Sequence, residues 1–316
     1  MPTAPPAVEL AAPDIAPYAA GNTGIPYVTS FDSGRPGRHV LVNALAHGNE
    51  LCGAITLDEL FRRGIRPLAG KLTLCFANVA AYRRFDPASP TASRFVDEDF
   101  NRLWDAATLD GKRQSAELAR ARALRPLVDT VDLLLDLHSM QQASPPLMLA
   151  GLTDKSLVLA RRVGVPEIIV RDAGHAAGAR LRDYGGFADP ASPKAALLVE
   201  CGQHWERPTA ELAMATAWRF LAAAGVLAPA EAARILARPA KPQRVVAVTD
   251  AVTIANDRFE FTEDFRGLEV IARAGTVIAH DDGREIRTPY DDCVLIMPSR
   301  RLLRGQTAVR LGRFTA

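Results

Sequence analysis

Short apolar runs alternate with segments of helical periodicity over the first three quarters of the chain. Nearly continuous apolar runs of strand length are followed by stretches in which apolar residues recur at about every third or fourth position. This alternation predicts a three-layer α/β/α domain. The expected strands are 38–46, 71–77, 131–137 and 195–199, and the expected helices are 51–63, 114–128, 155–163 and 208–224.

The pattern changes near Gln243 to short β-prone runs, which are separated by turn-forming residues such as Asp281-Asp282-Gly283. We therefore expect a small all-β domain at the C-terminal end, with strands within 244–254, 268–271, 276–279 and 294–297. The first residues are rich in Pro and Ala, which is typical of an arm. The predicted organisation is an arm at 1–20, an α/β/α domain at 21–240 and a β domain at 241–316.

Composition and charge exclude some partners. The 316 residues carry a formal net charge of +2, and the 38 basic residues are scattered rather than grouped, so nucleic acid is not expected as a partner. There is no apolar stretch of about 18 residues and no basic segment followed by an apolar run at the N-terminus. We expect a cytoplasmic protein without membrane contact. A homo-oligomer is compatible with the sequence.

The four cysteines, Cys52, Cys75, Cys201 and Cys293, are widely spaced and form no C-x-x-C pair. We expect four buried free thiols. Oxidative pairing and a cysteine nucleophile are the alternatives, although no activating base accompanies Cys201 in the sequence.

Two histidines and one glutamate form a candidate metal site. His47 and Glu50 lie three residues apart, where the first expected strand turns into a helix, and His138 closes another apolar strand. Catalytic zinc takes three protein ligands and leaves a position for water, so the set suggests hydrolysis. Taken alone, H-x-x-E is common, and a histidine at a strand end is usually only hydrogen bonded.

Four ordered motifs resemble the aspartoacylase/succinylglutamate desuccinylase family of the zinc carboxypeptidase superfamily. They are 46–50 (Ala-His-Gly-Asn-Glu), 94–102 (Arg-Phe-Val-Asp-Glu-Asp-Phe-Asn-Arg), 136–139 (Asp-Leu-His-Ser) and 198–202 (Leu-Val-Glu-Cys-Gly). The resemblance covers about residues 38–205, and the C-terminal β segment is similar in character. It implies a zinc-carboxypeptidase-like catalytic domain with a mixed central sheet.

By this resemblance, His47, Glu50 and His138 hold one Zn²⁺ per chain. Glu200 matches the catalytic glutamate, which takes a proton from the attacking water and gives it to the leaving amine. Arg94 matches the arginine that helps to polarise the scissile carbonyl. The alternative for Glu200 is an exposed glutamate at a strand end.

The same resemblance places three further residues of the second motif in the site. Asn101 and Arg102 match the pair that binds the α-carboxylate of the substrate. Asp99 matches an aspartate that supports a metal-bound histidine, and Asp136 is a further candidate for that role. Solvated arginines and an ordinary salt bridge are the alternatives.

The sequence departs from the family before Glu200. Aspartoacylases have an additional arginine there for an acidic substrate group, whereas residues 185–199 contain only Lys194. A neutral or basic amino acid is therefore at least as compatible as an acidic one. Arg180, Arg182 and Tyr184 lie upstream and cannot be aligned securely, and His175 is expected to be a solvated loop histidine.

The sequence thus predicts a zinc-dependent amidohydrolase that cleaves a small N-acyl amino acid by metal-activated water. A zinc carboxypeptidase acting on peptides is the alternative enzyme. A non-catalytic binding protein with the same fold is the alternative outside enzymes, although its expected loss of catalytic residues is not seen at His47, Glu50, His138 and Glu200.

Overall fold

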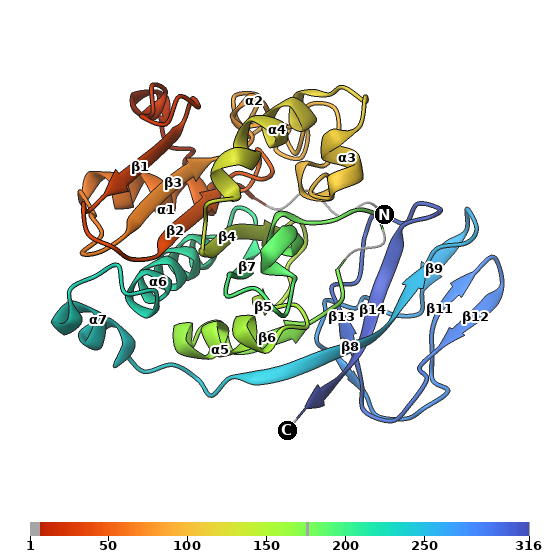
Figure 1. Ribbon diagram of the computed structural model, residues 1–316. Helices are drawn as coiled ribbons and strands as arrows, with labels where there is room; N and C mark the ends of the chain where they lie inside the picture. Colours follow the sequence, from red (N-terminus) through yellow and green to blue (C-terminus); the bar gives the residue numbers. More distant parts are fainter. Residues whose placement is uncertain (1–6, 175–176, 316) are drawn as a thin grey trace.

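A computed structural model describes residues 7–174 and 177–315 (Figure 1). His175 and residues 1–6 of the expected arm lie outside this part of the chain. Within it, eleven strands form one large mixed sheet. In chain order they are β1 (Val28–Asp32), β2 (His39–Ala44), β3 (Lys71–Phe76), β4 (Leu133–Met140), β5 (Leu147–Leu149), β6 (Ile168–Arg171), β7 (Ala195–Gln203), β8 (Arg244–Thr253), β10 (Val270–Ile271), β13 (Cys293–Ile296) and β14 (Thr307–Thr315).

The order of these strands is β1-β3-β2-β4-β7-β5-β6-β8-β14-β13-β10. The central strands β3, β2, β4 and β7 are parallel. Strand β1 pairs antiparallel with β3, and β5 pairs antiparallel with β7 and parallel with β6. The predicted fold class with a mixed central sheet is confirmed. The sequence pattern identified β2, β3, β4 and β7 but missed β1, β5 and β6, which are shorter.

The C-terminal β segment is joined to the large sheet. Strand β8 pairs in parallel with β6, from Ile168 opposite Arg244 to Arg171 opposite Ala247, and β14 and β13 follow. Backbone hydrogen bonds therefore cross the expected boundary at residue 241, and the domain limits stay a prediction. A separate antiparallel sheet is formed, in chain order, by β9 (Phe259–Phe261), β11 (Val277–Asp281) and β12 (Arg284–Arg287).

The helices cover both faces of the sheet (Figure 1). Against one face pack α1, α5 and α6, and against the other α4 and the 3-10 turns η2 and η3. The bounds are α1 (Leu51–Arg62), α2 (Val79–Tyr82), α3 (Ala106–Asp110), α4 (Ala116–Val128), α5 (Asp154–Val163), α6 (Arg207–Ala223), α7 (Pro229–Leu236), η1 (Ala16–Tyr18), η2 (Phe100–Arg102), η3 (Leu181–Asp183) and η4 (Gly185–Phe187).

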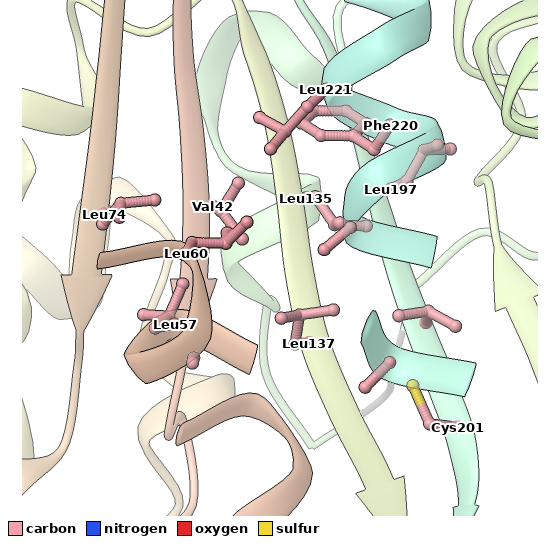
Figure 2. Close-up of a cluster of buried hydrophobic side chains, with 14 of the residues drawn as sticks. Val42, Leu57, Leu60, Leu74, Leu135, Leu137, Leu197, Cys201, Phe220 and Leu221 are labelled. Carbon is pink, nitrogen blue, oxygen red and sulfur yellow. The ribbon is translucent and has the colours of Figure 1, made fainter. Parts of the chain in front are cut away.

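Strand alternation supplies both cores. Val40 and Val42 of β2 pack in the core under α1 and α6, whereas Leu41 packs in the core on the opposite face. Figure 2 shows the first of these cores, in which Leu197 of β7 and Phe220 of α6 lie together. Because both faces are covered, the central strands are continuously apolar.

The N-terminal segment packs on the body of the protein from residue 7 onward. Glu9 N donates to the carbonyl of Trp205, and Tyr82 Oη donates to the carbonyl of Pro13. The four cysteines are buried and free, as expected. Across the described residues, no helix has the length and apolar character needed to cross a membrane.

The core on the α1/α6 face should dominate stability. Leu197→Ala removes a side chain with no exposed surface, and we expect it to lower the free energy of unfolding by about 2–5 kcal/mol. Leu152→Ala is the control, because that side chain is 58% exposed and should cost less than about 0.5 kcal/mol. Urea denaturation measures both, and equal losses would contradict the assignment of the core.

Candidate functional site

The predicted ligands come from two adjacent parallel strands. His47 and Glu50 lie in the turn between β2 and α1, and His138 lies near the end of β4, which pairs with β2. Gly48 makes this tight turn feasible, because a Cβ at that position would lie 2.4 Å from the backbone of Ala81. Its amide also donates to the carbonyl of Arg94 at 3.1 Å. The turn therefore fixes one ligand pair against the segment that carries Arg94.

The three candidate ligands converge on one point. His47 Nδ1 lies 2.8 Å from Glu50 Oε1, and His138 Nδ1 lies 3.1 Å from Glu50 Oε2. All three side chains are buried, and their candidate ligand atoms lie within 4.8 Å of one another. Ligand atoms around a tetrahedral zinc are separated by about 3.3 Å, given bonds of about 2.0–2.1 Å. The structure brings the set together, and metal binding itself stays a prediction.

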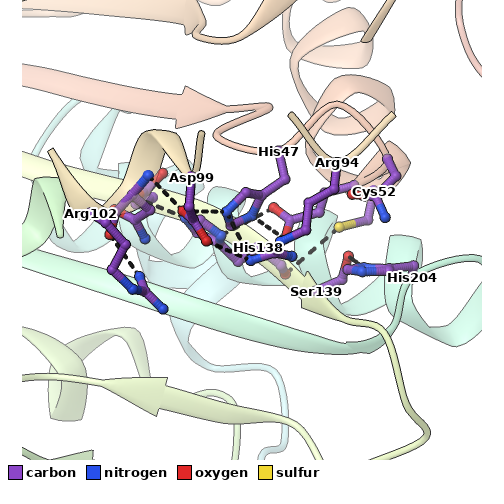
Figure 3. Close-up of polar contacts among 12 residues, drawn as sticks. His47, Cys52, Arg94, Asp99, Arg102, His138, Ser139 and His204 are labelled. Carbon is purple, nitrogen blue, oxygen red and sulfur yellow. Dashed lines mark hydrogen bonds and ion pairs between the residues drawn. The ribbon is translucent and has the colours of Figure 1, made fainter. Parts of the chain in front are cut away.

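A carboxylate stands behind each histidine. Asp99 Oδ1 lies 2.9 Å from His47 Nε2, and Asp136 Oδ2 lies 3.0 Å from His138 Nε2 (Figure 3). Each outer nitrogen thus faces a carboxylate, and each Nδ1 faces Glu50. Such a partner fixes the ring orientation and the tautomer that leaves Nδ1 free for a metal. Asp99 and Asp136 both occupy the positions expected for this role.

The donor set fits a divalent cation. Glu50 Oε2 is buried and has no aligned hydrogen-bond donor among the described residues, although His138 Nδ1 is close. Burial would raise the pKa of Glu50, but His138 and His47 outweigh it and hold that pKa far below its usual range. Burial likewise opposes the charged form of His138, yet Asp136 and Glu50 raise its pKa well above the usual value. A buried carboxylate that stays ionised between two imidazoles suits a cation.

Glu200 lies beside the candidate metal site. It is on β7, directly opposite His138 in the β4–β7 register, and it is 8% exposed. Its Oε2 has no hydrogen-bond partner among the described residues. Burial raises the pKa of Glu200 to about 7; the charge of Glu50 adds to this effect, and His138, His47 and Arg94 oppose it. An unpaired carboxyl group with this pKa is suited to proton transfer near neutral pH.

Arg94 reaches the site from the loop before η2. Its Nη2 donates to Asp99 Oδ2 at 3.1 Å and lies 3.0 Å from His47 Nε2. The side chain is about 30% exposed, so part of the guanidinium stays open to a ligand. Asp99 therefore orients both a candidate ligand and a candidate oxyanion donor (Figure 3).

Asn101 and Arg102 form η2, which begins after the cap made by Asp99. Asn101 Oδ1 accepts a hydrogen bond from Leu181 N at 2.9 Å, which turns its amide NH₂ away from η3. Arg102 donates to the carbonyl of Asn101 and has no hydrogen bond to a carboxylate among the described residues. It also lines a cavity of about 380 Å³ together with Asp99 and Gly178. None of the three candidate metal ligands lines that cavity.

The basic residues before Glu200 are engaged elsewhere. Arg180 binds both oxygens of Asp172, at 2.8 and 2.9 Å, and Arg182 binds Asp183. Lys194 donates to the carbonyl of Asp129. Tyr184 Oη donates to the side chain of the same aspartate. These groups hold the loop in place.

Two buried charged residues, Glu117 and Arg310, were not predicted from the sequence. Glu117 on α4 accepts hydrogen bonds from the amides of Val96, Asp97 and Glu98, and from Asn78 Nδ2, so it holds the loop that carries Arg94 and Asp99. Arg310 on β14 is only 9% exposed. No motif marks either residue, because each acts through contacts distant in sequence.

A buried polar pair, also missed, lies next to the site. Ser139 Oγ lies 2.7 Å from His204 Nδ1, and Figure 3 shows the pair beside Cys52. Burial is the largest of the causes that lower the pKa of His204 to about 3, which keeps this histidine neutral.

The fold and the geometry define a class: an α/β protein with a candidate His-Glu-His metal site at the ends of parallel strands. Residues 36–176 match the family model described as the succinylglutamate desuccinylase/aspartoacylase catalytic domain. This part of the chain is therefore similar to that catalytic domain, in agreement with the resemblance of the motifs. Glu200 lies beyond the matched residues.

Solved structures share the fold across almost the whole chain. The crystal structure of succinylglutamate desuccinylase from Vibrio cholerae has a TM-score of 0.68 at 18% identity, over 92% of this chain and 86% of the other. The X-ray structure of succinylglutamate desuccinylase from Vibrio parahaemolyticus has a TM-score of 0.64 at 19% identity, over 92% of this chain and 87% of the other. The product-bound structure of the ectoine utilization protein EutE from Ruegeria pomeroyi has a TM-score of 0.60 at 17% identity, over 90% of this chain and 88% of the other. At these identities the likeness concerns the fold. No curated protein sequence matches the chain.

Removing the carboxylate behind His47 should weaken metal binding. We expect Asp99→Asn to reduce zinc affinity about 10- to 100-fold, because the amide holds the imidazole less well in its ligating tautomer. Competition with a chromophoric chelator measures the affinity. Asp257→Asn, which changes an exposed aspartate of the C-terminal segment, is the control. Equal affinities in the two variants would remove Asp99 from the site.

Proposed function

We propose that this protein is a zinc-dependent amidohydrolase that removes the acyl group from a small N-acyl amino acid. The observation that carries the proposal is the convergence of His47, Glu50 and His138, with Glu200 opposite His138 and not hydrogen bonded. Deacylation also agrees with the activity named for two structural relatives, which are succinylglutamate desuccinylases. A cytoplasmic location and a homo-oligomer stay predictions.

A zinc ion held by His47, Glu50 and His138 would supply Lewis acidity to the acyl carbonyl and acidify an attacking water. Glu200 accepts the proton of that water on its unpaired carboxylate as the oxygen attacks the acyl carbon. When the C–N bond breaks, Glu200 returns the proton to the leaving amine nitrogen. Its pKa, raised to about 7 chiefly by burial, suits both steps.

Arg94 stabilises the negative charge that develops on the carbonyl oxygen. Its guanidinium is held by Asp99 through Nη2 and is partly exposed toward ligand. A fixed donor costs little reorganisation when the charge forms, which is why such groups contribute strongly to catalysis. Asp99 serves this step by holding Arg94 in place.

Arg102 and Asn101 bind the α-carboxylate of the amino acid. The Arg102 guanidinium has no carboxylate hydrogen bond of its own within the described part of the chain, and the Asn101 NH₂ group is oriented by the bond from Leu181. A planar guanidinium can give a carboxylate two parallel hydrogen bonds. This anchor places the amide one bond from the α-carbon near the candidate metal site.

The peptidase alternative uses the same groups but needs an open cleft. A C-terminal segment packed over the site would favour a short substrate over a peptide. If the protein were an inactive binding protein, Glu200→Gln would leave every measurable property unchanged. Both alternatives can be separated from deacylation by one assay.

The assay measures amine release from N-acetyl, N-formyl and N-succinyl amino acids and from peptides of three to five residues. The zinc-loaded chain should hydrolyse N-acyl amino acids, and Glu200→Gln should lower kcat by about 10²–10⁴ while zinc content is kept. Glu206→Gln, which changes a partly exposed glutamate at the start of α6, is the matched control. Turnover of peptides alone would make the protein a peptidase, and unchanged activity in the Glu200 variant would refute its role.

The rate should depend on the ionisation of Glu200. Glu200 must be deprotonated to act as the base. Without a metal its pKa is raised from 4.5 to about 7, and a bound cation would lower this pKa toward 4.5. We expect kcat/KM to rise about tenfold per pH unit below this pKa and to level off above it. Zinc content is measured at each pH, because protonation of the histidines would release metal. A rate that falls with rising pH between 5 and 7 would contradict this role.

A further inference from the structure

A pair of buried aromatic side chains follows β7 and takes no part in the proposed catalytic steps. His204 and Trp205 have no exposed surface, and they come directly after Gln203, the last residue of the strand. Each of them is hydrogen bonded to a different backbone segment. These two segments are the ones that carry the candidate metal ligands. We call His204 and Trp205 the aromatic clamp.

The first end of the aromatic clamp is attached to β4. His204 N donates to the carbonyl of Met140 at 2.8 Å, and His204 Nδ1 lies 2.7 Å from Ser139 Oγ (Figure 3). A neutral imidazole can accept a hydrogen bond from a hydroxyl group through one ring nitrogen. Ser139 and Met140 directly follow the candidate ligand His138. His204 therefore fixes the end of β4 that carries this ligand.

The second end is attached to the turn between β2 and α1. Trp205 Nε1 donates to the carbonyl of Asn49 at 3.2 Å, and Asn49 directly precedes the candidate ligand Glu50. All three polar groups of Trp205 are engaged, since its amide donates to Gln203 Oε1 and its carbonyl accepts from Glu9 N. A side chain held at so many points is preorganised for the contact that it makes.

The sheet brings the two segments together, but its ladder stops short of the ligands. The register of β2 with β4 ends at Ala44 opposite Leu137, before the turn that carries Glu50 and before His138. A hydrogen bond from Cys52 Sγ to the carbonyl of His138 also joins the segments at 3.8 Å, but a thiol is a weak donor. The aromatic clamp is therefore the stronger restraint on their separation.

A bulge in β7 gives the aromatic clamp its position. His138 pairs with Glu200, but Met140 pairs with Gln203, so two steps along β4 correspond to three along β7. Gly202 lies within this interval and has a φ of +124°, which glycine adopts readily. A bulge redirects the chain next to a site. Glu200 thus stays beside the candidate ligands, while the residues after the strand reach the carbonyl groups next to them.

We infer that His204 and Trp205 are positioning residues that set the distance between Glu50 and His138, and thereby the size of the cation that the site prefers. The inference rests on the metal site of the proposed function and extends it to metal selectivity. Zinc needs its ligands close together, because its bonds are about 2.0–2.1 Å long, and selectivity among divalent metals follows the geometry of the site. Loosening either end of the aromatic clamp should favour the larger Cd²⁺ over Zn²⁺.

The ratio of zinc to cadmium affinity tests the inference without turnover. Competition with a chromophoric chelator measures both affinities in the full chain. Trp205→Phe keeps an apolar ring and removes the indole donor. We expect it to lower zinc affinity about tenfold and the zinc-to-cadmium ratio about threefold or more. Trp104→Phe is the matched control, because Trp104 is also buried and its Nε1 has no hydrogen-bond partner among the described residues. This control should keep the wild-type ratio.

A purely structural role gives a different result. Loss of overall stability lowers the affinity for both ions by the same factor, because each ion binds the folded chain, so the ratio does not change. An unchanged ratio in Trp205→Phe would overturn the inference, and so would a wild type that binds neither ion. If the ratio falls but the wild type hydrolyses no N-acyl amino acid, the proposed function fails and the positioning role stands.

Ser139→Ala tests the other end of the aromatic clamp and serves alone if Trp205→Phe does not fold. It removes the hydroxyl that lies beside His204 Nδ1, and it should lower the zinc-to-cadmium ratio in the same direction. Ser156→Ala is its control, because Ser156 is a buried serine on α5 whose hydroxyl accepts a hydrogen bond from Thr153. An unchanged ratio in Ser139→Ala would overturn the role of His204.

Discussion

The site depends on one buried carboxylate held between two imidazoles. Glu50 is 1% exposed and lies within 3.1 Å of the Nδ1 atoms of His47 and His138. Such a charge is stable in a protein interior only with close partners of opposite sign. The parallel pairing of β2 and β4 provides them, since it places His47, in the turn after β2, and His138, on β4, on either side of Glu50. Strand order, the β2–α1 turn and the packing of Gly48 against α2 all serve this contact.

The surrounding structure fixes the partners of that carboxylate. Asp99 and Asp136 orient the two rings, and Asn43 donates to Asp136 at 2.8 Å. Asp99 is itself held by Arg94, in a loop whose backbone amides are bound by Glu117. The order of the site therefore extends through hydrogen bonds from the ligands to helix α4, and an isolated turn with the same sequence would not reproduce it.

Local sequence patterns predicted the parts of this arrangement that arise from neighbouring residues. The apolar runs identified β2, β3, β4 and β7, and the spacing of His47 and Glu50 predicted a pair of side chains that the structure brings together. Residues joined only by the fold were not predictable in this way. Glu117 resembles any glutamate in the first turn of a helix, although it is fully buried. Arg310 lies 110 residues after Glu200 in the sequence, and the pairing of β14 with β8 brings it near Asp172. The pairing of β8 with β6 was likewise not predictable, because no sequence pattern reveals it; the domain limits stay a prediction.

Strand β8 pairs with β6, and the C-terminal strands thereby remain part of the large sheet. At the central strands, the candidate site gathers four carboxylates, which belong to Glu50, Asp99, Asp136 and Glu200. Buried carboxylates are stable only beside positive charge. Arg94 and the two histidines supply part of that charge, and a divalent cation would supply more. The charge of the site therefore supports the predicted cation independently of the sequence motifs.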